Sequence, residues 1–291
     1  MIKKIFLIGT FTFITAIILF IFLDKKAAYL ETLTFEPIDH KVEYINADTS
    51  LQFLTIEDED EYTIEWNISS QLNQKAYLRK DISFLFEDGR LTEVLSKWDK
   101  NKQEMNIRKV INGEDSGHFQ AVSFHHSEIH YPNDEIKSRL TISCDDLYVI
   151  DSPLAPIQSF KVPSNEKELE GKRILDYIVE QQLAYIWKDM LGEYNIVADN
   201  YMAFPLTSIC NYKESPLPNM NEDQTTFVIH KIGESIYKEY FSGIQNEHNL
   251  GIKPVGSTVP LILLSNNNDH FIIMFQTLKG EKVQHMVTLP F

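Results

Sequence analysis

The most regular hydrophobic pattern in the chain is an uncharged run near its beginning, Ile5–Leu23, interrupted only by Gly9, Thr10, Thr12 and Thr15. Its 19 residues include no charged side chain. As a helix the run spans roughly 28 Å, close to the hydrocarbon thickness of a bilayer. Lys3 and Lys4 with the amino terminus precede it, and Asp24, Lys25 and Lys26 follow it. The small excess of positive charge before the run favours an N-terminus in the cytoplasm. The pattern predicts a single-pass protein of the cell membrane, with its C-terminal domain extracytoplasmic.

A cleaved secretory signal is the alternative interpretation of this run. Signal peptides normally have a shorter apolar region and small residues just before the cleavage point. Cleavage after Ala27 or Ala28 would instead place Lys25 or Lys26 where a small residue is needed. We therefore expect an uncleaved signal anchor.

From about Leu51 to Ile150 the apolar positions alternate with the period of two that is typical of β-strands. Asp88-Gly89 follows one such stretch, and it is a strong hairpin signal because both central residues of a type I′ turn have positive φ. Further reversals are expected at Asn112-Gly113 and at Tyr131–Asp134. The region is predicted to be an antiparallel meander of several long strands.

Beyond a break at Asp151–Pro156 the period becomes that of an amphipathic helix. Asn165 with Glu168 provides the start, apolar residues recur at steps of three and four, and Gly192 provides the stop. We expect helix Asn165–Leu191 to pack on a sheet, although a partner helix can take the same apolar stripe. The residues expected to contact the sheet are Ile174, Ile178 and Ile186.

The remainder of the chain predicts an irregular connection and then a second meander. Residues 193–223 contain three prolines and little periodicity. Thr225–Ile232 is expected to be a strand, and Glu234–Phe241 fits either a helix or a strand. The strands expected in the second meander are Val259–Leu264, Phe271–Leu278 and Lys282–Leu289.

The whole pattern predicts an α+β fold, a predominantly antiparallel β meander with one long amphipathic helix, behind an N-terminal transmembrane helix. Residues 1–26 are expected to hold a cytoplasmic tail and the transmembrane signal anchor. Residues 27–152 form a β-rich extracytoplasmic part, and residues 153–291 form an α+β part with the long helix and the second meander. These two parts can also form one continuous domain.

Charge limits the classes of partner that this protein can bind. The first 26 residues hold four lysines and one aspartate, so the remaining 265 residues carry 23 basic and 41 acidic side chains, a formal charge of −18. Such a surface repels the phosphates of nucleic acids and anionic lipid head groups. We therefore exclude nucleic acid as a partner.

Cys144 and Cys210 are the only two cysteines. An oxidising compartment permits a bridge between them, but a domain of this size does not need one for stability. Both lie in apolar or β-branched surroundings, and we expect two separately buried thiols.

The candidate chemistry is a group of histidines between His118 and His130. On a strand, His126, Glu128 and His130 share one face, and two imidazoles with a carboxylate are a reasonable set of zinc ligands. A polar, solvated face of a half-buried strand explains the same pattern. We keep these three residues as candidate metal ligands and expect the solvated face.

The sequence contains no G-x-S-x-G, P-loop, G-x-G-x-x-G or H-E-x-x-H motif.

The leading hypothesis is a membrane-anchored extracytoplasmic interaction or regulatory module without enzymatic activity and without a cofactor. It is held to the membrane by its N-terminal helix, and its protein partner is unidentified. One alternative is a carrier or sensor of an apolar ligand, held between a curved sheet and helix Asn165–Leu191. The other is a metal-dependent hydrolase that uses His126, Glu128 and His130.

Overall fold

The computed structural model describes residues 33–291 except 57–60, 153–154, 243, 246–250 and 253. The predicted anchor Ile5–Leu23 lies outside the described residues. Among the helices that are described, none combines the length and the apolar character needed to cross a bilayer. Contacts join Thr34–Phe291 into one compact unit.

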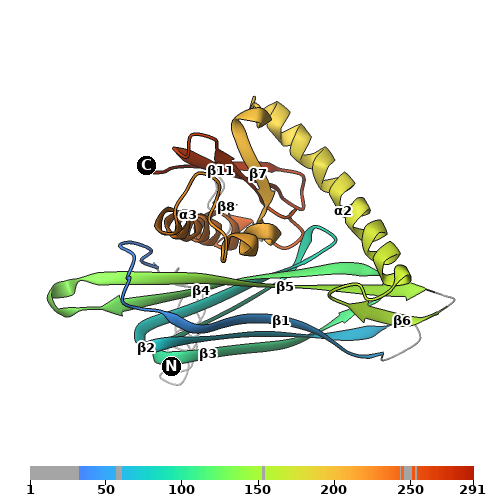
Figure 1. Cartoon of the computed structure of the whole chain (residues 1–291), viewed down its shortest axis with the longest axis horizontal. Helices are drawn as coiled ribbons and strands as arrows, with labels where there is room; N and C mark the ends of the chain where they lie inside the picture. The colour runs from blue at the N-terminus through green and yellow to red at the C-terminus, as the bar shows by residue number, and fades with distance from the viewer. Residues whose placement is uncertain (1–32, 57–60, 153–154, 243, 246–250, 253) are drawn as a thin grey trace, which may run out of the picture. The chain divides into compact units, whose positions relative to one another are not determined.

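A large antiparallel sheet forms the first part of this unit, so the predicted α+β class with mostly antiparallel strands is confirmed (Figure 1). The strand order is β1-β2-β4-β5-β6, and β3 pairs with β2. The six strands are β1 (Tyr44–Ile56), β2 (Tyr62–Glu87), β3 (Arg90–Gly113), β4 (Gly117–His130), β5 (Ile136–Ser152) and β6 (Ala155–Phe160).

The long strand β2 belongs to two layers of this sheet. Its first half, Tyr62–Leu72, pairs with β1, and its second half, Leu78–Glu87, pairs with β4. β3 follows both halves, with a register shift between Gln71 and Ala76. At this irregularity the strand passes from one layer to the other.

The two layers enclose an aromatic and aliphatic core. Side chains from both halves of β2 meet there, together with side chains from β1, β4 and β5. The buried members are Leu51, Tyr62, Ile64, Trp66, Ile68, Leu85, Phe119, Ala121, Leu147 and Val149. Because these side chains fill the space between the layers, the burial of apolar area supplies the main stabilisation of the sandwich.

Two of the three predicted reversals are confirmed. Asp88 and Gly89 have φ values of 47° and 79°, as a type I′ turn between β2 and β3 requires. A short 3₁₀ turn at Pro132–Asp134 (η1) joins β4 to β5. The reversal at Asn112-Gly113 is wrong, since both residues lie in β3. Gly113 is needed there for close packing instead, because a Cβ atom would lie 2.4 Å from the ring of Tyr62.

The predicted long helix is α2 (Glu166–Glu193), and its start is confirmed. The side chain of Asn165 accepts a hydrogen bond from the backbone N–H of Glu168. The expected stop at Gly192 is wrong, since this residue lies inside the helix. Asn195, with φ of 53°, takes the left-handed position that commonly follows a helix.

The face of α2 that packs differs from the predicted face. Ile174 and Ile178 are exposed, while Ile186 is partly buried against the second sheet. The helix buries Leu175, Val179, Leu183 and Met190. Apolar residues occupy two sides of this helix, so their spacing alone could not decide which side meets the sheets.

Substitutions on the two sides of α2 should have unequal effects on stability. Leu183 contacts the Asp88-Gly89 turn, where a Cβ atom on Gly89 would lie 3.1 Å from it. Leu183→Ala should lower the free energy of unfolding by roughly 2–3 kcal/mol, because it leaves a cavity. Ile178→Ala should change it by less than about 1 kcal/mol. Chemical denaturation of both variants measures the difference, and equal losses would contradict this orientation of the helix.

The second meander is confirmed, and a fourth strand joins it. The sheet order is β12-β11-β10-β7, and β7 comes from the stretch that was expected to be irregular. Its strands are β7 (Tyr201–Pro205), β10 (Leu261–Ser265), β11 (His270–Gln276) and β12 (Lys282–Thr288). A separate short pair consists of β8 (Ile244–Gln245) and β9 (Gly251–Ile252).

The predicted strand Thr225–Ile232 is wrong, because these residues belong to helix α3 (Glu222–Ser235). Asn221 and Gln224 form a capping box at its start, and this local signal outweighs the β-branched residues that follow. The helix continues into η4 (Ile236–Phe241), a single π-helical segment. Two short 3₁₀ segments, η2 (Ala198–Asn200) and η3 (Leu206–Tyr212), flank β7.

Candidate functional site

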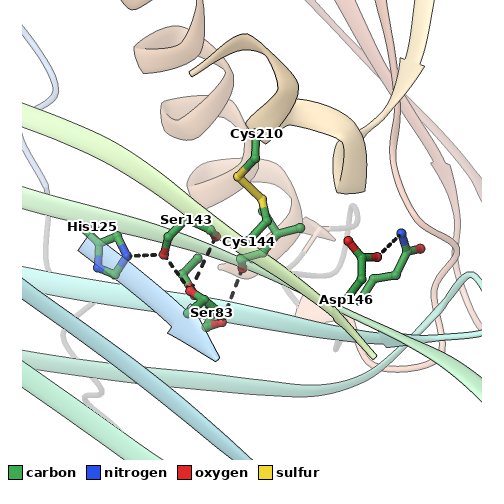
Figure 2. The surroundings of a disulfide bond; sticks show 10 residues. Ser83, His125, Ser143, Cys144, Asp146 and Cys210 are labelled. Atoms are coloured by element: carbon green, nitrogen blue, oxygen red, sulfur yellow. Dashed lines mark hydrogen bonds between the residues drawn. A yellow bond between two sulfur atoms is a disulfide. The ribbon is translucent and has the colours of Figure 1, made fainter. Parts of the chain in front are cut away.

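An acid, an imidazole and a hydroxyl are linked inside the sandwich, on three neighbouring strands. Asp81 on β2 lies 2.8 Å from His125 Nδ1, measured from its Oδ2 atom. Nε2 of His125 on β4 lies 2.7 Å from the Oγ of Ser143 on β5 (Figure 2). Antiparallel pairing sets the order, because Asp81 is paired with His125, and Ser143 lies on β5 two positions from Thr141, the partner of His125. This is the connectivity of a nucleophilic triad.

Other buried polar groups complete this network. Ser70 donates a hydrogen bond of 2.5 Å to Asp81, and Arg79 donates one of 2.5 Å to Ser70. On the far side, the hydroxyl groups of Thr49 and Ser143 lie 2.6 Å apart. Ser123 and Ser83 extend the chain of hydroxyls from Thr49. Most of these groups satisfy one another, so the network can remain buried in an otherwise apolar interior. Among the described residues, Asp81 Oδ1 and Arg79 Nε make no hydrogen bond.

The charged state of Asp81 follows from its neighbours. Burial opposes ionisation of this carboxyl, but His125 and Arg79 outweigh it and hold its pKa below the usual value. The Arg79 guanidinium lies 3.7 Å from the Asp81 carboxylate, and both side chains are buried. The pair is therefore ionic and depends on both members.

The network has the connectivity of a triad but not its accessibility. Asp81 and His125 have no exposed surface, and Ser143 is 6% exposed. A catalytic serine must present its oxygen to a substrate, whereas the Ser143 oxygen is enclosed by His125 and Thr49. The network's hydrogen bonds from Ser70 to Asp81 and between Thr49 and Ser143 join the two layers.

The three candidate metal ligands lie on the opposite face of β4, and two of them bind the chain's own backbone. Nε2 of His126 donates to the carbonyl of Thr34 at 2.9 Å, and the N–H of Thr34 donates to Glu128 at 2.5 Å. His130 is 3.7 Å from Glu128 and stacks on Tyr77. Within the described ranges, no three metal-binding side chains form a group that could hold an ion.

His126 and Glu128 are buried, so the expected solvated face is wrong for these two residues. The reason is the segment Thr34–Asp39, here called the strap, which covers them. The Phe35 ring lies 4.7 Å from His126 and 6.1 Å from His230 of α3, between ring centres. Burial lowers the pKa of His126 to about 4 and that of His230 to about 3. Both imidazoles are therefore neutral near pH 7.

The strap adds itself to one edge of β5. The N–H of Ser138 donates to the carbonyl of Pro37 at 2.9 Å, and the N–H of Asp39 donates to the carbonyl of Ser138 at 2.7 Å. Ile38 and Ser138 form a parallel bridge. This edge of β5 therefore accepts an extended segment through backbone hydrogen bonds.

The two cysteines form a disulfide, so the expectation of two separate thiols is wrong. Cys144 of β5 and Cys210 of η3 are 66 residues apart in sequence, with Cα atoms 6.1 Å apart. Ser143 points to His125, while Cys144 at the next position points to the other side and reaches Cys210 (Figure 2). The sequence gives no sign that η3 crosses β5, so this pairing could not be predicted.

A cleft lies next to the disulfide and is here called the β5–α3 cleft. Its volume is about 320 Å³, at the lower end of the range for ligand sites. One wall is β5, the second is residues 212–216 after η3, and the third is α3. The lining includes Arg139, Leu140, Ile142, Lys213, Glu222 and Ile229.

No protein-family model matches this sequence, and no curated protein is similar enough to count as a relative. The functional conclusion therefore rests on the geometry of the described residues.

Proposed function

We propose that this protein is a membrane-anchored, extracytoplasmic interaction module without enzymatic activity, which binds a protein partner through the exposed side of α2. The observation that carries the proposal is a row of large apolar side chains on that side. Ile174 is 50% exposed, Tyr177 63%, Ile178 45% and Tyr185 77%. Four such side chains along one helix are an unusual amount of apolar surface to leave in water.

The spacing of the row suits a helical partner. Steps of three, four and seven residues bring all four side chains to one side of α2. Charged residues stand at both ends of the row, with Lys167 and Glu170 before it and Lys188 after it. An apolar centre with a polar rim is the usual composition of a protein interface, in which tyrosine is enriched. The binding element of the partner is therefore an amphipathic helix.

The disulfide supports the proposed compartment. Disulfides persist in oxidising compartments and are rare in the cytosol, and the only two cysteines of this chain are paired. The acidic surface supports a protein partner over nucleic acid or anionic lipid head groups. The apolar-ligand carrier and the metal-dependent hydrolase stay predictions from the sequence.

The topology has a direct test in intact cells. We expect the chain to stay in the membrane fraction after a carbonate wash and to be digested by protease added outside. Without reduction, a thiol-reactive polymer should add no mass, and after reduction it should add two copies, one each at Cys144 and Cys210. A soluble species beginning near Tyr29 would contradict the anchor. A domain protected from outside protease would contradict the orientation.

The partner surface is tested by photo-crosslinking in the full-length, membrane-bound protein. A photoreactive residue in place of Tyr177 or Tyr185 should give a crosslink to one partner protein, mapped by mass spectrometry to an amphipathic helix. The same residue in place of exposed Lys102 on β3 should not. Crosslinks to lipid alone, or equal yields from all three positions, would contradict this use of α2.

A further inference from the structure

We infer that the β5–α3 cleft is a second binding site, which takes an extended peptide with alternating apolar and acidic residues by adding it as a strand to β5. This inference goes beyond the proposed use of α2, because the site lies on different elements and binds a different conformation of chain.

The first observation is an open strand edge. β4 pairs with β5 from Ile136 to Val149, while β6 pairs with the other edge of β5 only from Tyr148 onward. The backbone groups of Ser138 point away from β4, since they bind the strap. Backbone direction alternates along a strand, so Leu140 and Ile142 turn their N–H and C=O groups toward the same edge. Among the described residues, no strand pairs with them there.

The second observation is that this edge already accepts a strand from the chain itself. The strap binds β5 at Ser138 through two backbone hydrogen bonds. Leu140 is the next residue of β5 with the same backbone direction, and it lines the cleft. An extended segment at Leu140 and Ile142 would therefore make the same type of contact one step further along the strand.

The third observation is that the cleft has fixed walls. The disulfide links Cys144, two positions beyond Ile142, to Cys210 at the end of η3. Residues 212–216 follow directly and form one wall. On the other wall, a Cβ atom at Gly233 of α3 would lie 2.6 Å from Leu140, so helix and strand are in close contact. A preformed groove costs less ordering on binding than a mobile one.

The side chains of the cleft select the peptide. Leu140 lies against Gly233 of α3, and Ile142 and Ile229 also line the cleft, so this side favours an apolar residue. Neighbouring residues of an added strand point to opposite sides. The next residue of the peptide therefore lies on the side of Arg139, whose guanidinium forms no ion pair with another described residue. The other charged residues of the lining are Glu222 on α3 and the adjacent Lys213 and Glu214 on the wall after η3. The β5 side, with Arg139, is the side without an acidic residue and is therefore the place for a carboxylate.

The test uses the full-length protein in detergent micelles and two fluorescent probes. One probe is a heptapeptide of alternating valine and glutamate, and the other is the same peptide with lysine in place of glutamate. Fluorescence anisotropy should show saturable binding of the glutamate peptide only. Methylation of the peptide backbone nitrogens, which removes donors and keeps the side chains, should abolish the binding.

Charge reversal in the cleft provides the matched variants. Arg139→Glu should weaken binding of the glutamate peptide about tenfold and admit the lysine peptide. Lys102→Glu, which makes the same charge change on exposed β3, should leave both affinities unchanged. Circular dichroism confirms that each variant is folded.

Three outcomes would overturn this inference. They are the absence of saturable binding by the folded wild-type protein, undiminished binding of the methylated peptide, and equal effects of the two variants. Photo-crosslinking from Tyr177 does not depend on the cleft, so either proposal can fail while the other stands.

Discussion

Replacing Asp81 with alanine should lower the free energy of unfolding by roughly 3–5 kcal/mol, one of the largest effects of any single substitution in this protein. The variant leaves the Arg79 guanidinium buried without its counter-charge. It also removes the acceptor for His125 and for Ser70. Chemical denaturation at pH 7 measures the change.

Two controls separate the loss of charge balance from the loss of packing. Ser143→Ala removes a hydroxyl at the other end of the same network, and we expect a smaller loss of about 1–2 kcal/mol. The double variant Arg79→Met/Asp81→Leu removes both charges, so it should be more stable than Asp81→Ala alone. A double variant as unstable as the single one would show that charge balance is not the cause.

Acidification from pH 6.5 to pH 4 should destabilise the fold by several kcal/mol, and buried histidines should be the main cause. The pKa of His126 is lowered to about 4 and that of His230 to about 3, chiefly by burial. The unfolded chain therefore binds protons at these sites before the folded chain does. The stabilisation is complete above pH 6.5 and is lost as the pH falls toward the folded pKa values. His126 alone contributes roughly 3 kcal/mol, at about 1.4 kcal/mol per pKa unit.

Variants that cannot titrate identify the source of this pH dependence. His126→Gln keeps a donor for the Thr34 carbonyl, and together with His230→Gln it should flatten the profile of stability against pH between 6.5 and 4. His40→Gln is the control, because His40 is exposed and should leave the slope unchanged. A profile with the wild-type slope in the double variant would refute the assignment. Below pH 4, protonation of Asp81 lowers the free energy of unfolding further. The pKa of this carboxyl is lower in the folded protein than in the unfolded chain, so its stabilisation is lost as it becomes protonated.

The parts of the fold that were predicted correctly have their cause within a few residues. The Asp88-Gly89 turn needs only two residues that tolerate positive φ, and the start of α2 needs only Asn165 and the N–H of Glu168. In the second meander, β10 and β11 are short continuous apolar runs and β12 alternates. Each of these signals is local, so one sequence is enough to read it.

The wrong predictions have their cause in distant contacts. Gly113 is required by the ring of Tyr62, which reaches it across the strand pair. The buried side of α2 is chosen by the surfaces that it meets, through Leu183 and Met190. α3 is an exception, since the capping box of Asn221 and Gln224 was visible in the sequence and could have identified the helix.

For the candidate sites, too, local features could be predicted and distant contacts could not. The sequence placed His126 and Glu128 on one face of β4, and both do bind Thr34 from that face. It could not show that the strap covers them, because strap and strand are about 90 residues apart. The link from Asp81 through His125 to Ser143 depends on the register of three strands, and register becomes visible only in the folded chain.

The division of β2 between the two layers has a consequence for how the protein unfolds. The strand β2 contributes one half to each layer, so the two layers share a continuous strand. Unfolding of one layer would break hydrogen bonds in the other layer as well. Partial opening is therefore costly, and the sandwich has no natural point at which it could be cut into two independently folding halves.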